Sequence, residues 1–336
     1  MAHLFVAVDP SAFQFSGIHL SIALDWLRDP FQLLRIPFDD GVTTAIRFLV
    51  AHFRPLFQSV RVPINSLLQT FQQLLVGAPP SALLVFLTAV AWQLAGRRIG
   101  GLSFLGLSLI GFIGVWQQAM VSLSIVLTAV VVCVAIGIPV GVLSARSDRV
   151  EQVLRPLLDA MQTLPVFVYL VPVVMLFGIG EAPGVIATVI YALPPLIRLT
   201  NLGIRQVPEE VVEASLAFGS TPQQVLWETQ IPLAMPTILA GVNQTVLFAL
   251  GMSVVTSMIA VPGLGLLVLQ GLNSLDVGMA ATGGVSILAM AIILDRVTQS
   301  IGRIGFQRSW HQQGPVGLLY RLTRDQGSPS ESPKSI

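Results

Sequence analysis

The chain of 336 residues is too apolar and too weakly charged for an ordinary soluble domain. Hydrophobic residues make up 54% of it and charged residues only 10%, whereas soluble domains carry about 25% charged residues. The formal net charge of +1 excludes a strongly basic surface, so we expect no nucleic-acid partner. The composition therefore predicts a protein that uses the lipid bilayer as its solvent.

Residue types needed for metal or nucleotide chemistry are scarce. Cys133 is the single cysteine, which excludes an intrachain disulfide and a cysteine metal cluster. The four histidines are scattered, without the close spacing of a metal site. Lys334 is the only lysine, which excludes the lysine of a Walker P-loop. We expect no cofactor, no metal and no enzymatic activity in this chain, so any ATP that drives it is bound by another subunit.

Residues 1–80 precede the predicted membrane spans and form a leader. Residues 1–41 show no sustained period, and we expect neither a regular structure nor a cleaved signal peptide there. From Thr44 to Val60 apolar residues follow helical spacing, and arginine recurs every seven residues. This amphipathic pattern predicts a helix in the membrane interface, bent at Pro55. The amphipathic stripe continues towards residue 78, either in the interface or packed on the transmembrane helices.

Seven apolar runs follow the leader, and each is typical of a membrane span. They cover residues 81–96, 99–115, 119–145, 164–178, 183–200, 236–261 and 278–296. We expect an all-α integral membrane protein with about seven transmembrane helices. The first two are extra helices within 81–116, and the others belong to a core of residues 117–302. The charged, amphipathic stretch 148–162 connects two spans, and the end of the tail 303–336 is too polar to fold alone.

The distribution of arginine predicts the orientation of the chain in the membrane. If the seven spans alternate, one side collects Arg97, Arg98, Arg146, Arg149, Arg155, Arg198, Arg205, Arg303 and Arg308. The opposite loops, 116–118, 179–182 and 262–277, contain no arginine. Because cytoplasmic loops are enriched in arginine and lysine, we expect a cytoplasmic C-terminus and an N-terminus outside.

Residues 203–232, between the fifth and sixth spans, contain a locally specified pair of short helices. Pro208 suits the first position of a helix, and two glutamates follow it in the first turn. Gly219 can end that helix in the left-handed conformation. Ser220 can cap the next helix, with Gln223 at the capping-box position.

The same loop resembles the signature of the permeases of binding-protein-dependent ABC importers. That signature reads Glu-Ala-Ala, three residues, Gly, nine residues, then Ile-x-Leu-Pro. The chain keeps its spacing with Glu213-Ala214-Ser215, then Gly219, then Thr229-Gln230-Ile231-Pro232. Ser215, Thr229 and Ile231 are mild departures, because the glutamate, glycine and proline remain in place.

Further segments are similar to the permease subunit of the bacterial glycine betaine/L-proline, or ProU-type, importers. They read RPLLDAMQTLPVFVYLVPVVMLFGIG, IYALPPLIRLTNLGIRQVP and PLAMPTILAGVNQT. The resemblance covers about residues 20–322. It implies the type I ABC importer permease fold, a homodimer, two ATPase subunits and a substrate-binding protein outside the membrane, with glycine betaine or proline imported for osmoprotection. It also implies that the loop couples the permease to the ATPase through Glu213, Ala214, Ser215, Gly219, Ile231 and Pro232.

Polar side chains within the sixth span are candidates for the solute pathway. Thr245, Ala249, Ser253 and Thr256 share one helical face, and Asn243 and Gln244 stand at its start. Polar groups at membrane depth either line a pathway or join helices, and the sequence leaves both roles open. Gly137 and Gly141 favour close helix packing over a ligand role.

The sequence leaves the solute open and disfavours two other classes of function. Choline or an amino acid could replace betaine as solute, because the coupling loop is common to many importers. An ion-coupled secondary transporter is disfavoured because most span interiors lack ionisable residues. An intramembrane enzyme would need a paired nucleophile and base or a metal cluster, and no such pair occurs inside a span.

Overall fold

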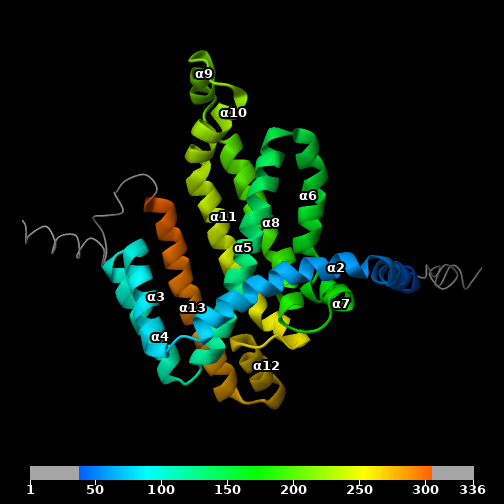
Figure 1. Cartoon of the computed structure of the whole chain (residues 1–336), viewed down its shortest axis with the longest axis vertical. Helices are drawn as coiled ribbons and strands as arrows, with labels where there is room; N and C mark the ends of the chain where they lie inside the picture. Colours follow the sequence, from blue (N-terminus) through cyan, green and yellow to red (C-terminus); the bar gives the residue numbers. More distant parts are fainter. Residues whose placement is uncertain (1–37, 305–336) are drawn as a thin grey trace, which may run out of the picture. The chain divides into compact units, whose positions relative to one another are not determined.

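The computed structural model describes residues 38–304, and within them the chain forms only helices (Figure 1). The helices are α2 (Phe38–Val76), α3 (Pro80–Ala95), α4 (Arg97–Phe112), α5 (Trp116–Arg146), α6 (Asp148–Thr163), α7 (Val166–Phe177), α8 (Glu181–Arg205), α9 (Glu209–Ala217), α10 (Pro222–Gln224), η2 (Val225–Gln230), α11 (Ile231–Thr256), η3 (Ser257–Ile259), α12 (Leu264–Ser274) and α13 (Val277–Ile304). The predicted all-α class is confirmed. Predictions for residues 1–37 and for the tail after 304 lie outside this part.

The chain divides into two compact units, Met1–His52 and Phe53–Ile336. In the first unit the described residues, 38–52, form the start of α2, which is largely exposed to solvent and carries two aspartates in its first turn. The predicted bend at Pro55 concerns how the two units are joined, and it stays a prediction. All other elements belong to the second unit.

Four helical runs of the described residues are long and apolar enough to cross a membrane on their own. They are α5, α8, the continuous run Pro222–Ile259, and Val277–Ile301 of α13. Two bent pairs bring the number of spans to as many as six when each pair is counted as one: Pro55–Val76 with α3, and α6 with α7. The helix count therefore agrees roughly with the predicted seven. The predicted spans 81–96 and 99–115 correspond to α3 and α4, which pack on each other and on α13.

The prediction for residues 148–178 is corrected by the structure. The expected span 164–178 is the 12-residue helix α7, about 18 Å long and too short to cross the roughly 30 Å of hydrocarbon. α7 meets α6 at a bend of 100°, and α6, which we expected only as a connection, lies beside α8 (Figure 1). Hydropathy disfavours α6 as a span because the helix carries five charged residues, one of which, Asp159, forms an ion pair of 2.7 Å with Arg198 of α8.

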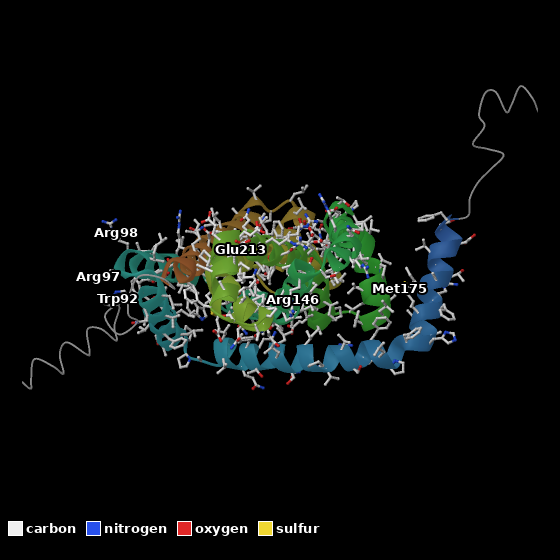
Figure 2. All side chains as sticks on the ribbon, turned by 90° about the horizontal axis from the view of Figure 1, so that it is seen from above. Trp92, Arg97, Arg98, Arg146, Met175 and Glu213 are labelled. Carbon is white, nitrogen blue, oxygen red and sulfur yellow. The ribbon has the colours of Figure 1, made fainter. Side chains whose placement is uncertain are left out.

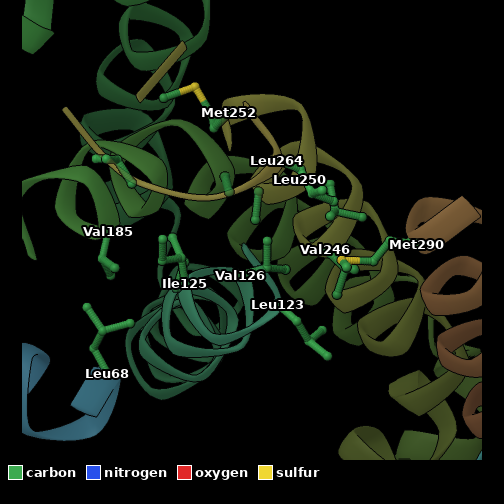
Figure 3. Close-up of a cluster of buried hydrophobic side chains, with 14 of the residues drawn as sticks. Leu68, Leu123, Ile125, Val126, Val185, Val246, Leu250, Met252, Leu264 and Met290 are labelled. Atoms are coloured by element: carbon green, nitrogen blue, oxygen red, sulfur yellow. The ribbon is translucent and has the colours of Figure 1, made fainter. Parts of the chain in front are cut away.

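The core of the second unit lies where α5, α8 and α11 pack together. Figure 3 shows the central side chains of this cluster, which include Leu123, Val126, Val185, Val246, Leu250, Met252 and Leu264. Leu68 of α2 joins the same cluster and is fully buried. The second half of α2 therefore packs on the other helices, and its predicted place in the membrane interface stays a prediction.

Small residues bring α5 and α8 close together, as predicted from Gly137 and Gly141. A Cβ atom added at Gly141 would lie 2.5 Å from the Cβ of Thr200, and one at Gly137 would lie 2.9 Å from a methyl group of Leu196. These contacts leave no room for a larger side chain, which confirms the close packing.

The second half of α2 also binds the segment between α7 and α8. The guanidinium of Arg61 donates to the carbonyl oxygen of Phe177 at 2.9 Å, and the amide of Gln72 donates to the carboxylate of Glu181 at 2.9 Å. Phe57 packs edge to face on Phe177 with ring centroids 5.3 Å apart. α2 therefore fixes the end of α7 and the start of α8.

Candidate functional site

The loop between α8 and α11 projects beyond the ends of both helices, with α9 at its tip (Figure 1). This place in the fold, here called the loop end, is where α8 ends at Arg205 and α11 begins at Ile231. The first predicted loop helix is confirmed as α9. The second is not separate, because α10, η2 and α11 form one continuous helical run from Pro222.

The sequence of α9 explains where this helix begins and ends. Pro208 precedes the first helical residue, one position earlier than predicted, and two glutamates occupy the first turn, where the helix dipole favours negative charge. Gly219 has a φ of +89°, which confirms the predicted left-handed conformation. The N–H of Gly219 donates to the carbonyl oxygen of Leu216 at 2.9 Å, and the N–H of Ser220 donates to the carbonyl oxygen of Ser215 at 3.2 Å. These two bonds form a Schellman motif, which fixes the turn rigidly.

The cap of the next helix lies one residue later than predicted. Thr221, and not Ser220, is the N-cap residue, and Gln224 takes the place expected for Gln223. The side chain of Gln224 accepts from the Thr221 N–H at 2.9 Å, while Thr221 Oγ1 accepts from the Gln224 N–H at 3.3 Å. The shift follows from Pro222, which fits the first helical position and makes the preceding residue the cap.

The signature proline widens the helical run that follows the turn. Pro232 has no N–H to donate to the carbonyl four residues earlier, and the segment just before it, η2, is a π-helix. The N–H of Ile231 accordingly donates to Leu226, five residues earlier. Wide turns of this kind are rare and often occur at functional sites.

A second, smaller hydrophobic cluster lies at the base of the loop. Its buried members are Ile204 of α8, Leu226 of η2, and Ala234 and Ile238 of α11. Side chains from the end of α5 pack against them, namely Ile138, Val142 and Ala145. The base of the loop therefore packs against α5, α8 and α11.

The coupling residues implied by the resemblance are largely accessible. Glu213, which Figure 2 labels, Ala214, Gly219 and Pro232 are exposed. Ser215 and Ile231 are half-buried. Ser215 lies within the loop, where its hydroxyl is 3.2 Å from that of Thr229. Glu213, Ala214 and Gly219 thus lie on the projecting surface of the loop, whereas Pro232 lies in the first turn of α11.

Large apolar side chains share that surface, and the sequence analysis missed them. Phe218 is 93% exposed and Trp227 60% exposed, with Leu216 and Val211 also exposed. An exposed apolar group on a projecting element marks an interaction site. These side chains could have been found from the sequence, because apolar residues gather around Gly219 in a loop that is expected to be polar.

The candidate pathway residues fall into two groups. Thr245 and Thr256 are fully buried: Thr245 donates to the carbonyl of Ala192 on α8 at 3.1 Å, and Thr256 to that of Met252 at 3.0 Å. Asn243 donates to Asp295 of α13 at 3.0 Å and accepts from Thr298. These three side chains bond within or between helices.

The side chains of the remaining two candidates, Gln244 and Ser253, make no hydrogen bond to another helix among the described residues. Gln244 is exposed on α11. Ser253 is half-buried, and its enclosed hydroxyl has no hydrogen-bond partner among the described residues. Within residues 38–304, no group of three or more His, Cys, Asp or Glu side chains could hold a metal ion.

Residues 137–304 match the family described as the binding-protein-dependent transport system inner membrane component. The chain is 55% identical over 296 residues to the glycine betaine/proline betaine transport system permease protein ProW of Escherichia coli, covering 87% of this chain and 84% of that one. The chain belongs to this permease family. It is thus a multi-pass inner-membrane subunit of an ABC importer, a class that works with ATPase and substrate-binding partners.

Other relatives of this permease differ in the solutes for which they are named. The glycine betaine permease OpuAB of Bacillus subtilis is 38% identical over 80% of this chain and 96% of its own. The choline permease OpuBB of the same organism is 30% identical over 52% of this chain and 81% of its own. The inward-facing MetNI methionine ABC transporter has a TM-score of 0.52 at 20% identity, over 59% of this chain and 97% of that chain. This last likeness confirms the type I permease fold.

Proposed function

We propose that this permease imports glycine betaine, proline betaine or proline as compatible solutes for osmoprotection. The observation that carries the proposal is the 55% identity, over most of both chains, to a permease named for glycine betaine and proline betaine. A relative of 38% identity that is named for glycine betaine supports the same solute class.

The loop between α8 and α11 couples the permease to its ATPase in this proposal. The exposed residues Glu213, Ala214 and Gly219 form the contact surface together with Phe218. A helix closed by a Schellman turn moves as a rigid body. Its seat on the small cluster of Ile204 and Leu226 would pass that movement to α5, α8 and α11.

We infer a symmetric assembly around this chain. Two copies of the permease pair with two ATPase subunits on the cytoplasmic side and receive solute from a binding protein on the other side. The N-terminus lies outside and the C-terminus in the cytoplasm, because the arginine-rich loops share one side of the membrane. The chain hydrolyses no ATP and binds no nucleic acid, since it lacks a P-loop lysine and a basic surface.

The solute pathway runs along α11 in this proposal. Gln244 is its best-supported member, because its side chain is exposed on the helix. Ser253 is the second, because its hydroxyl lacks a partner among the described residues. Asn243, Thr245 and Thr256 bond to backbone or to α13, and they would shape the pathway by holding the helices in place.

Two alternatives remain for the test to decide. Choline is favoured by the relative OpuBB, which is named for it, although the identity of 30% is lower. An ion-coupled transporter would use Asp295, a carboxylate in the apolar helix α13. That carboxylate already accepts hydrogen bonds from Asn243 and Gln299, at 3.0 and 2.7 Å.

The test is uptake of radiolabelled glycine betaine into proteoliposomes. Vesicles contain the permease with its ATPase and binding protein, and matched vesicles omit one partner at a time. Uptake that needs both partners and ATP, and that excess unlabelled glycine betaine abolishes, is expected. Uptake by the permease alone would contradict the importer, and stronger competition by choline than by betaine would contradict the solute.

A further inference from the structure

Arg205, the last residue of α8, binds three helices at the loop end through one guanidinium group. Its Nη2 atom lies 2.7 Å from a carboxylate oxygen of Asp148 and 3.0 Å from one of Glu151. The same nitrogen donates to the carbonyl oxygen of Ser144 at 3.0 Å. Nε donates to the side-chain oxygen of Asn201 at 2.8 Å.

Three of these four partners lie where α5 turns into α6. Ser144 belongs to the last turn of α5, and Asp148 and Glu151 to the first turn of α6, with Ser147 alone between the helices. A planar guanidinium that contacts several acceptors fixes their directions as well as their distances. Arg205 therefore fastens the end of α8 to the corner between α5 and α6.

The contribution of Arg205 to stability is modest, because its side chain is 35% exposed and that of Asp148 77% exposed. Ion pairs at such exposure are screened by solvent and stabilise a fold only weakly. Four contacts at one exposed side chain thus specify geometry more than they add stability.

The hydrophobic seat of the loop does not include α6. The cluster around Ile204 and Leu226 contains side chains from α5, α8, η2 and α11, and none from α6 among the described residues. At the loop end, the ion pairs that the described residues form between α8 and α6 are those of Arg205. α9 begins at Glu209, only four residues further along the chain.

We propose that Arg205 is a positioning residue that makes the α5–α6 corner follow the movement of α9. This inference rests on the proposed function, in which α9 is moved by the ATPase. α6 is a helix of 16 residues, about 24 Å long. Its far end joins α7 at a bend of 100°, and the last carbonyl of α7, that of Phe177, is held by Arg61 of α2. A movement received at Arg205 would reach α7 through this rigid helix.

The chain offers a matched control for Arg205. Arg198 lies on the same helix, two turns away, and binds Asp159 of α6 at 2.7 Å, with 41% of the Arg198 side chain exposed. It therefore joins the same pair of helices at similar exposure. Among the described residues, however, the hydrogen bond and ion pair of Arg198 go to Asp159 and reach neither the corner of α5 and α6 nor the loop.

The experiment measures solute imported per ATP hydrolysed in proteoliposomes that hold the complete importer. We expect Arg205→Gln to lower this ratio about fivefold or more, the low end of ordinary coupling between sites, while insertion and ATP hydrolysis persist. Arg198→Gln should leave the ratio unchanged. Arg205→Lys should restore part of it, because an ammonium keeps the charge but not the planar fork.

A second variant reaches the same contact from the other side. The double change Asp148→Asn with Glu151→Gln keeps Arg205 and removes both carboxylate charges, and we expect the same loss of the ratio. If Arg205→Gln fails to insert into the membrane, the ratio measured for this double variant tests the inference. A normal ratio in the inserted variants, or an equal loss in Arg198→Gln, would overturn the inference. Absence of uptake with the unmodified complex would instead overturn the proposed function.

Discussion

The hydroxyl oxygens of Ser215 in α9 and Thr229 in η2 lie 3.2 Å apart. These residues occupy two of the three positions at which the loop departs from the family signature, which has Ala and Ile there. The two departures are thus neighbours in space although fourteen residues separate them. A polar pair has replaced an apolar pair, and it joins α9 to the start of the long helical run.

We predict that these two departures compensate for each other. Ser215→Ala leaves the half-buried hydroxyl of Thr229 without its partner, and Thr229→Ile leaves that of Ser215 with only the carbonyl oxygen of Val211, 3.0 Å away. Both changes together recreate the family pattern. A double-mutant cycle should give a coupling free energy of about 0.8 kcal/mol in magnitude, within the range for a hydrogen bond. Uptake should fall about twofold in each single variant and recover in the double one.

The control for this cycle is Ser220→Ala, which removes a hydroxyl of the same loop that makes no side-chain hydrogen bond among the described residues. It should leave uptake unchanged. Additive losses from Ser215→Ala and Thr229→Ile would show that the two hydroxyl groups act independently.

The turn after α9 depends on the conformation of Gly219 and not on space around it. No atom lies within 4 Å of a Cβ added there, but its φ of +89° is strained for any side chain. Gly219→Ala should cost about 1 kcal/mol in the turn and lower uptake in an inserted protein. Gly219→Asn should be milder, because asparagine tolerates the left-handed region. Equal uptake in the alanine variant and the unmodified protein would contradict this mechanism.

Phe218 should be a hot spot for binding the ATPase subunit. Its ring is 93% exposed at the tip of the loop, and aromatic anchors of this kind often contribute about 2 kcal/mol when truncated. Phe218→Ala should weaken co-purification of the ATPase without lowering the thermal stability of the permease.

The matched control is Phe112→Ala, because Phe112 is 92% exposed but lies at the end of α4. Its removal should leave ATPase binding unchanged. If the two alanine variants lose the ATPase to the same extent, the loss would reflect a general effect of exposed rings and not the loop.

The close approach of α5 and α8 should make Gly141 intolerant of larger residues. Gly141→Ala would place its Cβ 2.5 Å from Thr200, and overpacking of this kind costs about 1–3 kcal/mol. Thermal unfolding in detergent should show the loss. Gly101→Ala is the control, since nothing lies within 4 Å of a Cβ there, and it should leave stability unchanged or raise it slightly.

Burial of Cys133 permits a direct test of orientation. This cysteine is fully buried, so a membrane-impermeant maleimide should not react with the unmodified protein. In intact cells the reagent should label Ser274→Cys, at the end of α12, but not Gln223→Cys in the loop. Both should react once the membrane is permeabilised. Labelling of Gln223→Cys in intact cells would reverse the proposed orientation.

Local sequence was sufficient for features that each depend on one segment. Long apolar runs predicted α5, α8, α11 and α13, because a span must satisfy its backbone within one helix in lipid. The spacing around Gly219 predicted both α9 and its left-handed end, since glycine adopts that conformation without strain. The loop signature, carried by the same segment, predicted the permease family.

Only the tertiary structure decided features that depend on two segments. The five charges of α6 assigned it to a connection, whereas its packing beside α8, with the ion pair of Asp159 and Arg198, depends on both segments and cannot be read from either alone. The shared face of α11 suggested a pathway for Thr245, whose bond to the Ala192 carbonyl appears only when α8 lies beside it. In the sequence, Arg205 is one of several arginines on the predicted cytoplasmic side. Only the fold shows that it bonds to Ser144 of α5 and Glu151 of α6. The role of a polar side chain in a membrane helix thus depends on the group to which it bonds. That group belongs to another segment, which only folding brings close.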